Sequence, residues 1–221
     1  MKTEAALHLF QYWNRLRNGR QAPPRADIEP YDIREVLGQT FILESEGQNG
    51  PLQFRLVGTT MSGLIGRPLL GSPFNALFQE QHCAVLSRLL RNCYQDKSVI
   101  VLGLDAITAS QRQTILEILL LPLQNEQGGY RILGCMAPHH IQFWHGLEPV
   151  ILLDLHSIRV IDPDREPLFL SNRPEMPLPP GLAPHDTHFQ SDKHPATRPH
   201  VKLVVIQGGK NTSSQTILTK P

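Results

Sequence analysis

The chain has 221 residues, enough for one domain with extensions or for two small domains. Hydrophobic residues make up 40% and charged residues 19%, ordinary values for a globular protein with a buried core. The net charge of +1 gives no reason to expect nucleic acid or an anionic membrane as a partner. No apolar run approaches the ~20 residues of a membrane span, and the first residues lack the apolar core and cleavage site of a signal peptide.

Three cysteines bear on the cellular location: Cys83, Cys93 and Cys135. The first two fall on one predicted helix, where ten residues separate them by about 15 Å along the axis, too far for a disulfide. No Cys-x-x-Cys pair is present. Buried, reduced thiols in a cytoplasmic protein are therefore the simplest interpretation.

A helix is predicted over residues 4–17, ending at Asn18-Gly19. Its apolar side chains recur at spacings of three and four and include Leu9, Phe10, Trp13 and Leu16. A helix of about fourteen residues, separated by Pro23-Pro24 from the rest of the fold, is marginal alone. The stripe must therefore pack on the chain's own sheet, on a second subunit, or on both. We predict that the helix covers the outer sheet face and meets its counterpart there in a two-fold homodimer.

Residues 40–45 and 52–57 are predicted to form a hairpin of two strands. In the second strand, alternation places Leu52, Phe54 and Leu56 on one face. The alternation stops at Gly58, where a threonine can cap a short helix from Met61 to Ile65 that Gly66 ends. Strand, turn and short helix would together make the wall of a small cavity.

Residues 67–78 are irregular but apolar, so we expect them to fold over a core or pocket. A second helix is predicted over residues 79–95, followed by three strands over residues 98–107, 112–123 and 130–136. The middle strand is apolar on both faces except for Glu117, which predicts that both faces of the sheet are covered.

A further strand is predicted over residues 149–161, rich in valine, isoleucine and leucine. A proline-rich, mostly irregular extension comes next, with a β-prone run at residues 200–207 that could add an edge strand. The expected organisation is a helical flank over residues 1–38, a domain over residues 39–161 and the extension over residues 162–221.

This order of elements resembles the PAS fold, and local phrases add to the resemblance. They are Phe41-Ile42-Leu43-Glu44, Phe54-Arg55-Leu56-Val57-Gly58-Thr59 and Gly66-Arg67-Pro68-Leu69-Leu70-Gly71. The opening Tyr12 to Arg20, and Ile132-Leu133-Gly134, are similar to a family of small stand-alone PAS-like proteins of alphaproteobacteria. The resemblance implies an α+β fold: a five-stranded antiparallel sheet with helices on one face, often dimeric through flanking helices.

The resemblance also implies a sensory or protein-interaction module, not an enzyme. Since no kinase, cyclase or DNA-binding domain is attached, the signal would pass to a separate partner protein. Seven apolar residues are the candidates for a small apolar ligand pocket, unless they simply fill the core: Phe54, Leu56, Met61, Leu64, Phe74, Leu86 and Leu90.

No cofactor is expected, and the alternative is a haem sensor in which His82, near the start of the longer helix, binds the iron. A histidine at that position is more often exposed. The residues around Cys83 lack the Asn-Cys-Arg-Phe-Leu phrase of flavin photoadduct domains. Cys135 and His145 are the only obvious additional ligands for the neighbouring pair His139 and His140, so a polar loop is favoured over a metal site. No hydrolase, P-loop or metalloprotease motif is present, so no enzyme is predicted.

Overall fold

The computed structural model of the chain describes residues 1–45, 47, 50–124, 129–164 and 176–177. Two compact units divide the chain, Met1–His185 and Asp186–Pro221, and all the described residues belong to the first. The domain boundaries expected after residues 38 and 161 stay predictions. The edge strand expected at residues 200–207 lies outside the described residues.

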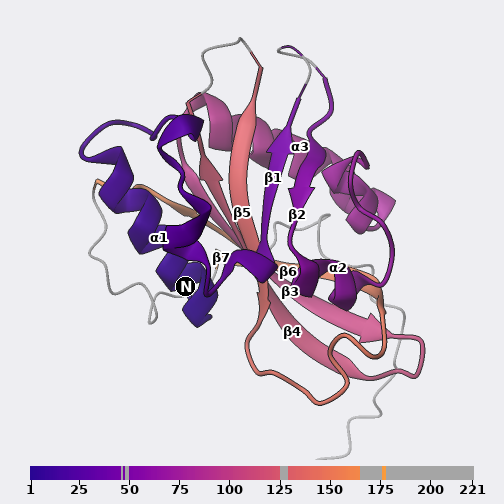
Figure 1. The fold of residues 1–221 in the computed structure, drawn as a ribbon. Coiled ribbons are helices and arrows are strands. Elements are labelled where there is room, and N and C mark those ends of the chain that lie inside the picture. Colours follow the sequence, from indigo (N-terminus) through magenta and orange to yellow (C-terminus); the bar gives the residue numbers. More distant parts are fainter. Residues whose placement is uncertain (46, 48–49, 125–128, 165–175, 178–221) are drawn as a thin grey trace, which may run out of the picture. The chain divides into compact units, whose positions relative to one another are not determined.

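One antiparallel sheet organises the first unit, with its strands in the order β2-β1-β5-β4-β3-β6-β7 (Figure 1). The predicted α+β fold and order of elements are confirmed. The sheet extends past the five strands of the resemblance, because β3 also pairs with the further strand predicted from the sequence. The strands are β1 Thr40–Glu44, β2 Gln53–Val57, β3 Val99–Thr108, β4 Gln113–Pro122, β5 Arg131–Pro138, β6 Val150–Ile161 and the two-residue β7 Met176–Pro177.

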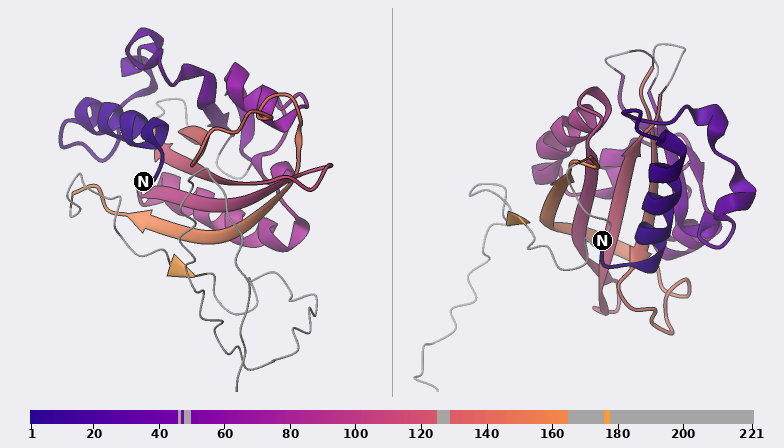
Figure 2. Two further views of the ribbon diagram at one scale, coloured as in Figure 1. Left: turned by 90° about the horizontal axis from the view of Figure 1, so that it is seen from below. Right: turned by 90° about the vertical axis from the view of Figure 1, so that its left-hand side faces the viewer.

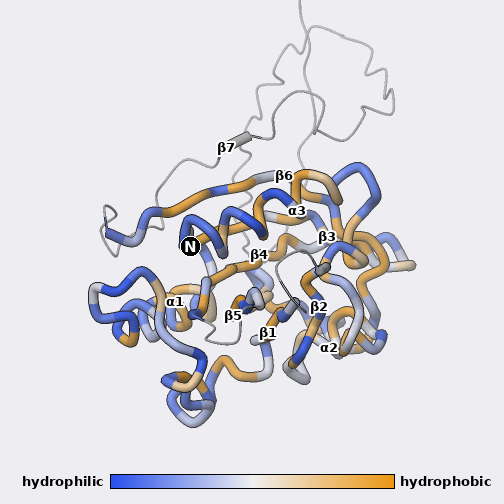
Figure 3. Tube along the Cα trace, turned by 90° about the horizontal axis from the view of Figure 1, so that it is seen from above, coloured by the Kyte–Doolittle hydropathy of each residue, from blue (hydrophilic) through white to orange (hydrophobic). Residues whose placement is uncertain are grey.

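The helices lie close to their predicted positions along the chain. They are α1 Glu4–Arg17, α2 Thr59–Ile65 and α3 Glu80–Gln95, with short 3-10 turns η1 Arg25–Asp27, η2 Pro30–Ile33, η3 Leu37–Gln39 and η4 Phe74–Leu77. In the hydropathy-coloured trace of Figure 3, hydrophobic residues follow the strands, whereas α1 alternates between hydrophilic and hydrophobic positions. No helix in the described part of the chain is long and apolar enough to cross a membrane.

Helices cover both faces of the sheet, so the single helical face implied by the resemblance is incomplete (Figure 2). We call the face packed against α2, η4 and α3 the inner face, and the face packed against α1 the outer face. Each face has its own cluster of buried apolar residues. Alternation along β4 supplies both, because Ile118 lies in the inner cluster and Leu119 in the outer one. The predicted position of the N-terminal helix on the outer face is confirmed.

Helix α1 is defined at both ends by its own sequence. The Thr3 side chain accepts a hydrogen bond from the Ala6 N–H at 3.3 Å and so caps the first turn. The helix ends at Asn18, whose φ of 45° lies in the left-handed region. Between these ends, Trp13 is fully buried, and its Nε1–H donates to the Pro122 carbonyl of β4 at 2.8 Å.

A bulge in the β1–β2 hairpin overturns one prediction from alternation. Leu43 pairs with Phe54, but Ile42 pairs with Leu56, so Arg55 is an extra residue in β2. Phe54 therefore stays in the inner core, while Leu56 lies opposite an outer-face residue and is 40% exposed. The expectation that Leu56 shares a pocket face with Phe54 is wrong, because one inserted residue reverses the side of every later side chain.

The bulge predicts unequal effects for two neighbouring substitutions. Leu56→Gln is expected to change the free energy of unfolding by less than about 0.5 kcal/mol, since Leu56 is already half-exposed. Phe54→Leu is expected to cost about 1 kcal/mol or more, because Phe54 is 1% exposed. Urea denaturation of the two variants measures both values, and equal losses would contradict the bulge.

Candidate functional site

Six of the seven predicted pocket residues meet in the inner core. These are Phe54, Met61, Leu64, Phe74, Leu86 and Leu90, and each is at most 5% exposed. The rings of Phe41, Phe54 and Phe74 pack together with centroids 5.5–6.0 Å apart. The spacing is that of aromatic pairs in direct contact. This packing favours the interpretation in which these residues fill the core, while a ligand between them stays a prediction.

His82 is fully buried, so its expected exposure is wrong. On α3 it stands four residues before Leu86, on the helix side that packs against the inner core. Its Nε2 lies 2.8 Å from Oδ1 of Asp154 on β6, while its Nδ1 is buried with no hydrogen-bond partner among the described residues. To bind haem iron, His82 would have to use Nε2 and give up its contact with Asp154, or use the buried Nδ1. The haem alternative stays a prediction.

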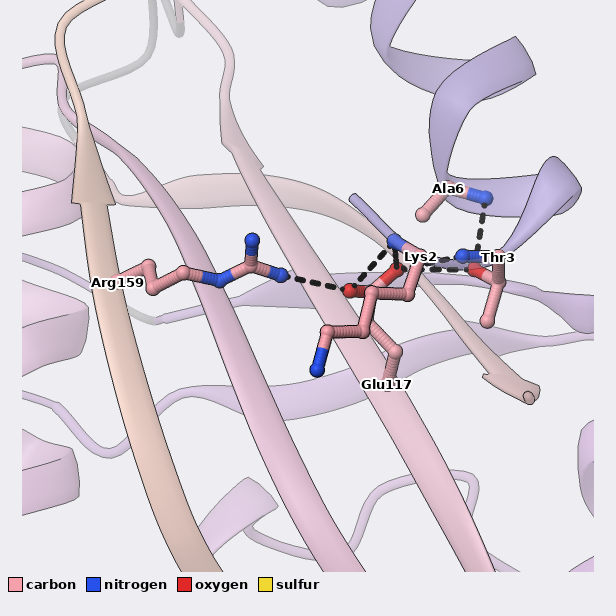
Figure 4. Close-up of polar contacts among 5 residues, drawn as sticks. All are labelled: Lys2, Thr3, Ala6, Glu117 and Arg159. Atoms are coloured by element: carbon pink, nitrogen blue, oxygen red, sulfur yellow. Dashed lines mark hydrogen bonds and ion pairs between the residues drawn. The ribbon is translucent and has the colours of Figure 1, made fainter. Parts of the chain in front are cut away.

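Glu117 is the centre of a buried polar cluster on the outer face (Figure 4). Its Oε1 accepts hydrogen bonds from the Thr3 N–H at 3.1 Å, the Thr3 hydroxyl at 3.0 Å and the Lys2 N–H at 2.9 Å. Its Oε2 accepts from the Arg159 guanidinium of β6 at 2.9 Å. Since Glu117 is 1% and Arg159 7% exposed, this cluster fixes the start of α1 to two strands by a desolvated charge pair.

The last turn of α1 makes a second polar contact, with residues that follow β6. Arg17 is 5% exposed and forms an ion pair with Asp164 at 2.8 Å. It also donates to the Pro163 carbonyl at 3.2 Å. Polar contacts at both ends and the apolar stripe between them therefore hold α1 on the outer face.

The residues predicted for a dimer interface lie against the chain's own sheet. Leu9, Phe10 and Trp13 are at most 2% exposed, and Leu16 is partly buried beside the same outer cluster. The predicted contact with the sheet is confirmed. The homodimer stays a prediction, and a second copy would have to contact another side of α1 while the helix is docked.

The remaining titratable candidates are the loop histidine His145 and the buried cysteines Cys93 and Cys135. No group of three potential metal ligands occurs among the described residues. His145 accepts a hydrogen bond from the Gln142 N–H at 3.2 Å, and burial lowers the pKa of its imidazole. Burial raises the pKa of the Cys93 and Cys135 thiols well above their usual range, so both stay protonated and unreactive.

The Glu117 cluster was not predicted from the sequence, although Glu117 was recognised as the exception in a strand that is otherwise apolar on both faces. A single carboxylate in an otherwise apolar strand signals a buried charge that needs a partner. Its partners at Lys2 and Thr3 are more than 110 positions away and act mainly through main-chain N–H groups, which no side-chain pattern records.

The sequence model of a family described as the PAS domain matches residues 1–137, more than half of the chain. A search of curated proteins found no match. A solved structure of a variant of RsLOV is similar at 14% identity with a TM-score of 0.37, over 50% of this chain and 65% of that one. The chain thus covers less than two thirds of that structure.

Proposed function

The chain belongs to the PAS domain family, and from this premise we propose that it is a non-enzymatic sensory and protein-interaction module that signals to a separate partner. PAS domains are typically non-enzymatic sensory modules, and this supports the proposal. The observation that carries the proposal is the Glu117 cluster, which holds α1 on the outer face.

We propose that the partner protein recognises helix α1. Buried charge pairs rarely maximise stability, and their best-attested use is to specify one arrangement of packed elements. Here the pair of Glu117 and Arg159 specifies the docked position of α1 by binding Lys2 and Thr3. Releasing α1 would expose the apolar outer cluster beneath it, which includes Leu119.

Strand β4 supplies a physical connection between the two faces. Leu116 and Ile118 are fully buried in the inner core, and Glu117 stands between them with its side chain on the outer face. A change of packing on the inner face moves the same strand that positions the Glu117 carboxylate. The inner core would be the sensing side and α1 the output side.

An inner-core substitution should therefore loosen α1. Ile118→Val is expected to cost about 0.5–1.5 kcal/mol and to leave the chain folded. We expect it to speed hydrogen exchange of the α1 amides, because it loosens the packing of β4 beside Glu117. Exchange measured by mass spectrometry reports this directly. The matched control is Ile151→Val, which also removes one methylene but from a side chain that is 63% exposed. Equal α1 exchange in the two variants would overturn the proposed connection.

The partner itself is tested by affinity purification from source cells with wild-type protein and Glu117→Gln. The glutamine keeps the size of the side chain but loses the charge that pairs with Arg159. Proteins whose capture depends on Glu117 support the proposal. A set of captured proteins that is identical for both baits contradicts it.

A further inference from the structure

A groove of about 310 Å³ lies beside α3, away from the contact of α1 with the outer face. We call it the α3 groove. Its volume is at the lower end of the range for small-molecule sites. Its lining combines apolar, polar and charged side chains, among them Leu52, Asn75, Ser87, Leu90, Arg91 and Tyr130.

Arg91 gives the α3 groove an unused positive charge. It is exposed on α3, and it forms no hydrogen bond or ion pair with any of the described residues. A guanidinium is a planar fork of N–H donors that matches the two oxygens of a carboxylate. The charge of the groove therefore favours a carboxylate ligand.

Asn75 contributes a polar side chain to the wall of the groove. Its Nδ2 donates to the Ser87 hydroxyl at 2.7 Å and to the Cys83 carbonyl at 3.4 Å. Its Oδ1 is buried and accepts no hydrogen bond from the described part of the chain. The two contacts of Nδ2 hold this side chain in place as part of the groove wall, while Oδ1 lies out of reach of a ligand in the groove.

The walls of the α3 groove are apolar and aromatic. Leu52 and Leu90 are 8% and 5% exposed and belong to the edge of the inner core. The Tyr130 ring packs on Tyr94 with centroids 4.0 Å apart, and the Lys97 ammonium lies 3.8 Å from the Tyr94 centroid. These contacts hold the aromatic wall in place, so that it presents a preformed surface to an apolar group.

We propose that the α3 groove binds a small carboxylic acid that has an apolar body. The carboxylate pairs with Arg91, and the apolar body packs on Leu52, Leu90 and Tyr130. This inference rests on the groove alone. It stands if α1 proves not to be the output element, and its failure leaves that proposal intact.

N-acetyl-L-phenylalanine is a suitable probe, because it combines a carboxylate with an apolar ring. Titration of the ¹⁵N-labelled full chain is expected to shift the amide signals of Ser87 and Arg91 and to saturate. Arg91→Gln should weaken binding about tenfold or more. N-acetyl-L-phenylalanine amide, which lacks the charge, should lose affinity to a similar extent.

Arg88→Gln is the matched control, since Arg88 is also exposed on α3 but does not line the groove. It should bind the probe as the wild type does. Both arginines are exposed, so neither substitution threatens the fold. Absence of saturable binding up to about 10 mM overturns the proposal. So does equal binding by Arg91→Gln, or equal binding of the amide.

Discussion

Glu117→Ala is expected to lower the free energy of unfolding by ~3–5 kcal/mol. The substitution leaves the Arg159 guanidinium, 7% exposed, without its carboxylate. It also removes the acceptor for the main-chain N–H groups of Lys2 and Thr3. An uncompensated buried charge costs far more than the net gain of the intact pair, which is why one substitution has so large an effect. Urea denaturation with linear extrapolation measures the loss.

Two further variants show whether the buried charge causes this loss. Glu35→Ala removes a carboxylate whose side chain is 71% exposed and should change stability by less than about 0.5 kcal/mol. Glu117→Gln keeps one oxygen acceptor and should fall between the wild type and Glu117→Ala. A loss below about 1 kcal/mol for Glu117→Ala would mean that water reaches this carboxylate and that it does not fix α1.

Trp13→Ala should also cost ~3–5 kcal/mol, because the largest side chain of α1 is fully buried against the sheet. Trp13→Phe keeps most of the apolar contact but leaves the Pro122 carbonyl without its donor, for a loss of about 1–3 kcal/mol. Chemical denaturation of both variants, with Gln11→Ala on the exposed side of α1 as the control, measures these values.

The two large losses should not add. If Glu117→Ala already frees α1 from the outer face, removing the Trp13 ring as well costs less than it does in the wild type. Additive losses in the double variant would show that the helix stays docked when either contact is lost, and they would count against release of α1 as the signal.

Hydrophobic periodicity was enough to predict the elements and the position of α1, because burial of apolar stripes dominates the energy of folding. It failed where one residue changes the register. Alternation predicted Leu56 beside Phe54, and the extra Arg55 reversed it. The amino-acid sequence of β2 does not indicate the bulge, because a polar residue such as Arg55 is equally compatible with a regular strand and with a bulge.

The candidate sites were less predictable than the fold, for two different physical reasons. The position of His82 was predictable, since it shares a helix face with Leu86 and Leu89, but the usual exposure of histidine was given more weight. The Glu117 cluster and the α3 groove depend on contacts between distant parts of the chain. The unpaired Oδ1 of Asn75 in particular has no signature in composition or spacing.

The kind of donor that binds Glu117, main chain or side chain, also determines which substitutions each donor position tolerates during evolution. Residue 2 contributes its main-chain N–H to the Glu117 cluster, and every amino acid except proline, which has no N–H, supplies that donor. Residue 3 contributes its hydroxyl as well and is confined to serine or threonine if every bond is to remain. Within this cluster, selection on the docking of α1 therefore falls on the side chains of residues 3, 117 and 159.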